Sequence, residues 1–227
     1  MGTKFSFEVP LNHLEDFEPF QDFYFVLSFL CKKSTEYLNY FLGKKVEGKK
    51  VFLDNSFNEL RRPESSKELA NLSRILNADM VISPDCDGWS LKELGKAYDE
   101  LASMICPEKI LVVVKSMEEE RMFRERGVLH FCTTYEQRSG LDKILLYKSF
   151  HFLGLRDFQE IEKYQPYTCD TGIPVKLALE GKDMYDWAVE GHPHTATTPD
   201  FFDLTLTEKE LNLARRNCQW IRARVAP

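Results

Sequence analysis

Four residues that can carry a charge follow short apolar runs in this sequence. Asp54 ends VFLD, Asp85 ends MVISPD, Lys115 ends LVVVK and Asp170 ends YTCD. If each run is a strand of a parallel sheet, three carboxylates and a lysine face one mouth, because the loops after parallel strands converge there. A single Asp in this place is also typical of a helix N-cap or a turn. Three of them on different strands favour a site, since crowded carboxylates repel unless a ligand or cation uses them.

The elements that must position these residues follow from an alternation of β-rich and amphipathic runs, which is typical of repeated βα units. The predicted strands are 4–9, 23–30, 50–54, 80–85, 109–115, 127–133, 149–155 and 167–170. The predicted helices are 32–42, 65–77, 90–106, 117–126, 157–164 and a C-terminal helix at 208–224 with a basic end. Ser65 with Glu68 and Ser90 with Glu93 have the spacing of capping boxes at two helix starts.

This pattern predicts a compact α/β fold, a TIM-type (β/α)8 barrel, with an open doubly wound sheet as the alternative. We expect residues 1–227 to form one catalytic domain, with a C-terminal loop and basic helix from about 191–227. Within that loop, His192 and His194 with Asp200 and Asp203 could bind a metal, but a Pro-Thr-rich surface loop is the favoured interpretation.

Composition excludes several classes of protein. With 43% hydrophobic and 29% charged residues the chain can bury a core, and disordered and coiled-coil classes are excluded. A net charge of -6 argues against attachment to nucleic acid by bulk positive charge, so any such contact must be local. The six cysteines form no CxxC pair and are interpreted as reduced thiols. No signal peptide or membrane span is expected, which predicts a cytoplasmic protein.

Three segments in order, VFLDNSF, ADMVISPDCD and HFLGLRDFQEIEKYQPYTCDTGIP, resemble the tRNA-guanine transglycosylase superfamily. Its virus-associated branch, which inserts 7-deazaguanines into DNA, is the nearest in pattern. The resemblance spans residues 51–174 and implies exchange of a guanine for a 7-deazaguanine derivative through a covalent bond between an Asp and the sugar.

Residue by residue, the resemblance implies Asp170 as the nucleophile and Asp54 as the general acid and base. Asp85 would read the guanine edge, and Gly154 would let the backbone approach the base, because glycine has no Cβ. The motif serine Ser56 is implied to contact the substrate as well.

Further contacts are expected around this predicted pocket. Lys115 stands about where the family reads the base with a glutamine. His151 either faces the substrate or is a core histidine. Arg61 and Arg62 follow Asp54 and could hold a phosphate of the nucleic acid.

The sequence also departs from the family. It lacks the zinc-binding cysteines, so no metal or other cofactor is expected, and DNA is favoured over tRNA as the substrate. Asp186 in GKDMYD is an alternative nucleophile, with Asp170 favoured because it closes an apolar strand.

The expected partners are nucleic acid and a 7-deazaguanine base, with a homodimer or an accessory nucleic-acid-binding chain as alternatives for assembly. The competing functions are a base-excising N-glycosylase or nucleoside hydrolase, and a non-catalytic interaction module derived from the barrel.

Overall fold

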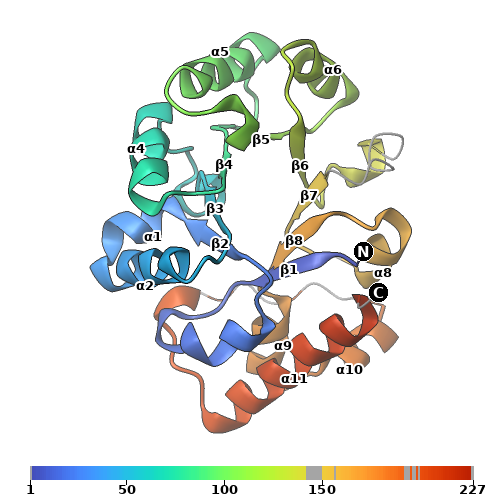
Figure 1. Cartoon of the computed structure of the whole chain (residues 1–227). Coiled ribbons are helices and arrows are strands. Elements are labelled where there is room, and N and C mark those ends of the chain that lie inside the picture. The colour runs from blue at the N-terminus through green and yellow to red at the C-terminus, as the bar shows by residue number, and fades with distance from the viewer. Residues whose placement is uncertain are drawn as a thin grey trace. The chain divides into compact units, whose positions relative to one another are not determined.

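The computed structural model describes residues 2–141, 150–155, 157–191, 195, 198 and 200–225 (Figure 1). The chain divides into two compact units, and the division falls within the seventh strand. The terminal unit comprises Met1–Asp22 and Phe152–Pro227, and the central unit comprises Phe23–His151. The expectation of a single catalytic domain over 1–227 stays a prediction.

Among the described residues, eight strands form one sheet in the order β1-β8-β7-β6-β5-β4-β3-β2. The strands are β1 Lys4–Phe7, β2 Tyr24–Leu27, β3 Val51–Asp54, β4 Met80–Ile82, β5 Ile110–Val113, β6 His130–Thr134, β7 Phe150–Leu153 and β8 Thr168–Thr171.

The strand order confirms the (β/α)8 barrel class. Strands that follow one another along the chain are neighbours from β2 to β8, and β1 pairs in parallel with β8, which joins the first strand to the last. A doubly wound sheet instead reverses its order at a switch point in the middle. The alternative of an open doubly wound sheet is therefore wrong.

Helices alternate with the strands along the chain. They are α1 Ser28–Lys33, α2 Thr35–Val46, α3 Phe57–Leu60, α4 Ser66–Leu76, α5 Leu91–Ala102, α6 Met117–Glu125, α8 Phe158–Tyr164, α9 Ile173–Leu179, α10 Met184–Val189 and α11 Glu208–Val225. Short 3-10 turns are η1 Leu11–His13, η2 Glu15–Phe20, η3 Pro107–Lys109, η4 Arg138–Leu141 and η5 Phe201–Asp203. None of the described helices is long and apolar enough to cross a membrane.

Both predicted capping boxes are confirmed, at the starts of α4 and α5. Two of the predicted strands end three residues earlier than expected. The strand predicted at 23–30 stops at Leu27 because α1 begins at Ser28. The strand predicted at 80–85 stops at Ile82, and Pro84, which has no N–H to donate, prevents the ladder from continuing.

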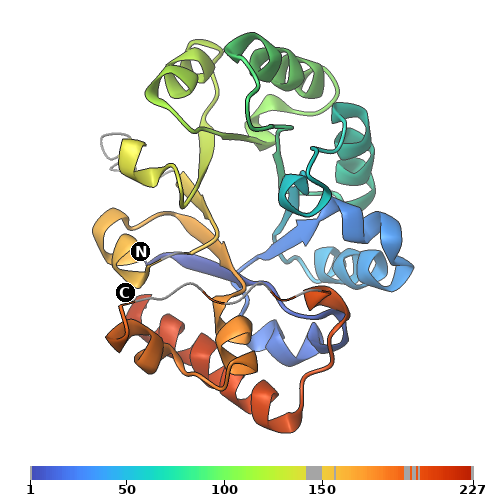
Figure 2. The ribbon, with the colours of Figure 1, turned by 180° about the vertical axis from the view of Figure 1, so that it is seen from behind.

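In the central unit, helices α2, α4, α5 and α6 cover one side of the strands β2 to β6, and both views show this arrangement (Figures 1 and 2). Aromatic rings pack between β2, β3 and β7: the centroids of Phe23 and Phe52 are 4.6 Å apart, and His151 stacks on Phe25 at 5.3 Å. Of the strands in this cluster, β3 carries a charged residue, Asp54, at its carboxyl end.

In the terminal unit, α11 packs on α9, and one buried amide ties three helices together. The Asn217 side chain donates to Pro174 O at 3.0 Å and accepts from Met184 N–H at 3.0 Å. The basic end of α11 makes contacts within the unit as well, because Arg222 Nη1 lies 2.9 Å from Asp22 Oδ2. All six cysteines are free thiols in the structure.

Candidate functional site at the carboxyl ends of three strands

Two overlapping turns follow β3, and each is closed by a bond from a backbone N–H to the side chain two residues earlier. Ser56 N–H donates to Asp54 Oδ2 at 2.7 Å, and Phe57 N–H donates to Asn55 Oδ1 at 2.9 Å. Ser56 is fully buried and has a φ of +55°, a left-handed conformation that costs roughly 1–2 kcal/mol for a residue with a Cβ. The contacts around it must therefore hold the turn in place.

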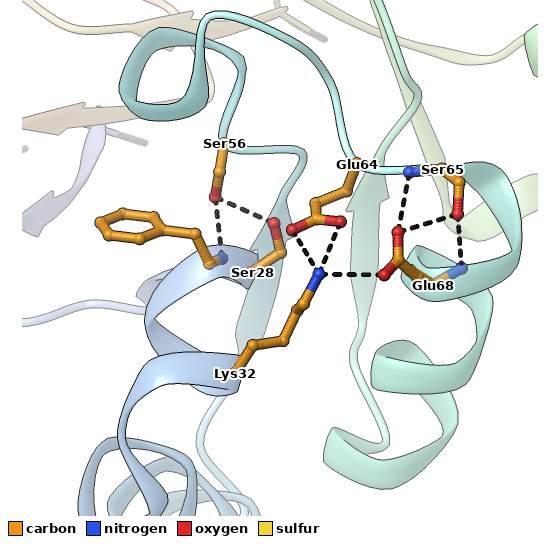
Figure 3. Close-up of polar contacts among 7 residues, drawn as sticks. Ser28, Lys32, Ser56, Glu64, Ser65 and Glu68 are labelled. Atoms are coloured by element: carbon orange, nitrogen blue, oxygen red, sulfur yellow. Dashed lines mark hydrogen bonds and ion pairs between the residues drawn. The ribbon is translucent and has the colours of Figure 1, made fainter.

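Figure 3 shows these contacts. The Ser56 hydroxyl oxygen accepts from Ser28 Oγ at 2.9 Å and from Phe29 N–H at 3.2 Å, so it is held by the start of α1. One turn further along α1, Lys32 Nζ lies 3.0 Å from both carboxylate oxygens of Glu64 and 2.9 Å from Glu68 Oε1. Residues of α1 therefore bond to both ends of the segment that joins β3 to α4, to Ser56 near its start and to Glu64 near its end.

The same loop is closed onto the strand end by its backbone. Glu64 N–H donates to Asn55 O at 3.0 Å. Burial raises the pKa of Glu64, whereas hydrogen bonds from Lys32, Glu64 and Ser65 lower the pKa of Glu68 to about 2. Lys32 therefore neutralises a carboxylate that would be costly to bury alone. We regard Lys32 and Glu64 as positioning residues for the turn at Asp54.

Asp85 and Lys115 form an ion pair between the segments that follow β4 and β5. Lys115 Nζ lies 2.8 Å from Asp85 Oδ2, and Asn55 Nδ2 donates to Asp85 Oδ1 at 2.8 Å. Asn55 also donates to Ser83 O at 2.8 Å. Asp85, 6% exposed, is thus bonded through both oxygens, and Asn55 links the end of β3 to the segment after β4.

Lys115 has a second carboxylate partner and an aromatic neighbour. Its Nζ lies 2.7 Å from Asp87 Oδ1 and 5.5 Å from the centre of the Phe57 ring. Burial opposes the charge on Lys115, but attraction from Asp85 and hydrogen bonds to Asp85 and Asp87 outweigh it and raise the pKa of this lysine. Lys115 is therefore a protonated ammonium with two carboxylate partners.

Glu119 belongs to the same cluster and was missed by sequence reasoning. Its Oε2 accepts from Lys115 N–H at 2.7 Å, and Ser116 caps the first turn of α6 beneath it. Burial raises the pKa of Glu119, and the charge of Asp85 adds to the increase. The Ser116–Glu119 spacing is the same S-x-x-E signal found at the two confirmed capping boxes, so the sequence did carry a cue.

Four of the predicted site residues, Asp54, Ser56, Asp85 and Lys115, are linked in the central unit. Asn55 lies between Asp54 and Ser56 in the sequence and donates to Asp85, which pairs with Lys115. His151 belongs to the same unit, but it is 1% exposed and its ring packs among the Phe rings described above. Arg61 and Arg62 lie in the loop after α3 and are exposed.

The terminal unit holds the other two predicted residues. Gly154 N–H donates to the buried Asp170 carboxylate, 3.3 Å from each oxygen, and Gly154 has a φ of +68° that favours glycine. Asp186, the alternative nucleophile, lies in the first turn of α10, where its N–H donates to Asp183 Oδ1 at 2.8 Å. His192 and His194 lie outside the described residues.

Comparison with known proteins gave matches only among solved structures, since neither a family model nor a curated protein sequence matches this chain. N-acetylneuraminate lyase from Mycoplasma synoviae is 12% identical, with a TM-score of 0.57 over 95% of this chain and 89% of the other. KGPDC from Streptococcus mutans is 11% identical, with a TM-score of 0.56 over 99% of both chains. N-acetylneuraminate lyase from Fusobacterium nucleatum is 8% identical, with a TM-score of 0.56 over 100% of this chain and 99% of the other.

These findings overturn the resemblance to the guanine transglycosylases and the base exchange it implied. The similar structures named here are lyases and KGPDC, and no transglycosylase family model matches. The resemblance rested on short runs in which an Asp or a Gly follows a strand, and many (β/α)8 barrels place such residues there. The motifs are therefore typical of the barrel architecture and do not identify a chemical reaction. At these identities the comparisons show the fold alone, and that fold is the (β/α)8 barrel.

Proposed function

We propose that this chain is a lyase-type enzyme that acts on an anionic carbonyl compound through an enolate. Its proposed active centre comprises Asp54, Asn55, Asp85, Lys115 and Glu119. The observation that carries the proposal is the Lys115 ammonium paired with the buried Asp85 at the carboxyl ends of the strands, where (β/α)8 enzymes place their active sites. The similarity to lyases of the same fold supports this reaction class.

Lys115 would stabilise the negative charge that develops in the reaction. When the bond between the α and β carbons of a carbonyl compound breaks, the electron pair moves towards the carbonyl oxygen and forms an enolate. A fixed ammonium beside that oxygen lowers the barrier, because it is already oriented when the charge appears. Asp85 keeps Lys115 protonated and in place. The raised pKa argues against Lys115 acting as a neutral amine nucleophile.

Glu119 is the proposed proton carrier. Its raised pKa lies closer to neutrality than that of an ordinary glutamate, which suits a group that must both accept and donate a proton. In the cleavage direction, the base takes the proton from a β-hydroxyl group, the carbon–carbon bond breaks, an aldehyde leaves, and the enolate then takes up a proton at carbon. Asp54 is the second candidate for this proton transfer.

The test measures the reversible proton exchange at the carbon beside the carbonyl. The full chain is incubated with pyruvate or 2-oxobutyrate in D2O, and proton NMR follows the loss of the signal beside the carbonyl as deuterium is incorporated. We expect catalysed exchange by the wild type and a loss of at least about 100-fold in Lys115→Met. An exchange rate that equals the rate in buffer for both acids would contradict the proposal.

A further inference from the structure

The two carboxylates on Lys115 differ in how firmly they are held. Asp85 is buried and is bonded to Asn55 as well as to Lys115. The side chain of Asp87 is 76% exposed, and its Oδ1 lies 2.7 Å from Lys115 Nζ. Within the described part of the chain, that ion pair is the only bond the Asp87 carboxylate makes. Asp85 is therefore the more firmly held of the two partners of the cation.

The backbone around Asp87 also permits its departure. Asp87 lies in a turn closed by the bond from Trp89 N–H to Cys86 O at 3.2 Å, and Gly88 in this turn has a φ of +82°. Among the described residues, the last backbone bond from this segment to β5 is made earlier, from Ser83 N–H to Leu111 O at 2.8 Å. Because the Asp87 carboxylate lies in solvent, water screens its attraction to Lys115, so losing this contact costs little.

We propose that Asp87 occupies the subsite of the substrate's carboxylate and leaves Lys115 when the substrate binds. This inference rests on the proposed function, because it requires that Lys115 face a ligand. An ammonium has three N–H donors, and one stays with Asp85. The donor released by Asp87 takes the carboxylate of the substrate, and the third is available to the carbonyl oxygen beside it.

Asp87 then determines specificity for charge. Hydrogen bonds between two ionised groups are roughly twice as strong as neutral ones, so a carboxylate can displace Asp87 where a neutral oxygen cannot. The substrate class is therefore a carbonyl compound with an adjacent carboxylate, and an uncharged compound of the same shape is rejected by competition from the protein itself.

The experiment is calorimetric titration of the full chain with pyruvate and with its neutral amide, pyruvamide. Asp87→Asn should bind pyruvate about threefold to tenfold more tightly than the wild type, because the competitor has lost its charge. Its affinity for pyruvamide should change much less, because the neutral side chain that replaces Asp87 still offers Lys115 an amide oxygen that is as good an acceptor as the oxygen of pyruvamide and is already in place. Asp99→Asn is the matched control: Asp99 is 63% exposed, pairs with Arg126 at 3.6 Å in the same unit, and its loss changes the net charge equally. We expect the control to bind both compounds as the wild type does.

Three results would overturn the inference: weaker or unchanged binding of pyruvate by Asp87→Asn, an equal gain for pyruvamide, or no binding of pyruvate to either protein. A gain for inorganic phosphate without a gain for pyruvate would overturn the assignment of a carboxylate. Binding is measured by calorimetry and turnover by deuterium exchange, so the two can be judged separately. Tighter binding of pyruvate without deuterium exchange upholds the inference and rejects the proposed function, whereas exchange without any effect of Asp87→Asn does the reverse.

Discussion

The two ends of the strands β3 to β5 in the central unit each carry a lysine–aspartate ion pair, but the pairs differ in what else they contact. At the amino end, Lys45 Nζ lies 2.7 Å from Asp79 Oδ2, and the same oxygen accepts from Val51 N–H at 2.8 Å. Asp79 N–H in turn donates to Val51 O at 2.8 Å. At the carboxyl end, Lys115 contacts two aspartates, and the bonds of the Asp85 carboxylate within the described residues are to the side chains of Lys115 and Asn55.

This difference separates a pair that ties the sheet together from the pair that we propose to be functional. Asp79 satisfies the backbone at the start of β3, so its charge stabilises the sheet directly. At the carboxyl ends, Lys115 bonds to Asp85 and Asp87, so one positive charge faces two negative ones. The carboxylate of Asp87 is exposed to solvent. Barrel enzymes use the same division, with stability at the amino ends of the strands and chemistry at the carboxyl ends.

The largest expected effect comes from removing each lysine in turn. Lys115→Met should lower the rate of deuterium exchange by about 100- to 1,000-fold, because the group that stabilises the enolate oxygen is lost. Lys45→Met should leave the rate within about twofold, because that lysine lies at the other end of the strands. The rates are measured by proton NMR in D2O. If Lys115→Met does not fold, Lys115→Arg tests the same point, since a planar guanidinium replaces the compact ammonium without loss of charge. Equal losses in the Lys115 and Lys45 variants would break the comparison.

The second prediction concerns Glu119 and pH. Glu119→Gln keeps an oxygen that can accept from Lys115 N–H but cannot take up and release a proton near neutral pH, so we expect exchange to fall about 100-fold. Because burial raises the pKa of Glu119, its contribution to stability is present below the pKa of the unfolded chain, about 4.3, and is lost as pH rises through the folded pKa. The variant should therefore gain stability relative to the wild type between pH 4 and pH 8, as measured by urea unfolding at each pH. A constant difference across that range would refute a raised pKa.

The third prediction contrasts the two aspartates. Asp85→Asn should lower exchange by about 10- to 100-fold, because Lys115 loses the counter-ion that orients it. Asp79→Asn should instead lower the free energy of unfolding by about 1–3 kcal/mol and leave exchange nearly unchanged, since it weakens a charge-assisted bond to the backbone. Chemical denaturation and the exchange assay on the same samples give both quantities. A loss of activity in Asp79→Asn that exceeds the loss in Asp85→Asn would reverse the assignment of the two ends.

The smallest effect is expected at the loop that positions Asp54. The pKa of Glu68 is lowered to about 2, so its stabilising contribution is present above the unfolded pKa and is lost as pH falls from about 5 towards 2. Glu68→Gln should therefore lose less stability on acidification than the wild type, by under about 1 kcal/mol because the side chain is half exposed. Glu93→Gln is the matched control, since Glu93 fills the same capping position in α5 and has no lysine partner among the residues that the structure describes. Unfolding in urea at pH 7 and pH 3 measures both.

The sequence could predict the barrel and the strand ends, because strand periodicity and parallel topology are local and repetitive signals. It placed Asp54, Asp85 and Lys115 at those ends for that reason. It could not predict that Asn55 reaches Asp85 across 30 residues, because that bond depends on the register of neighbouring strands. It also extended a strand over 23–30, since Ser28–Leu30 are apolar enough for either structure and the packing of α1 decides between them. The resemblance misled because strand-end aspartates are shared by barrels of unrelated chemistry.

The most direct test of the central claim is to locate the bound substrate. Pyruvate is titrated into the uniformly 15N-labelled chain, and the backbone amide shifts are followed by two-dimensional NMR. The account predicts that the largest shifts fall at residues 54–57, 85–89 and 115–119, with Lys45, Asp79 and Lys109 nearly unaffected. Shifts that cluster at the amino ends of the strands, or that leave residues 115–119 unchanged at saturation, would contradict it.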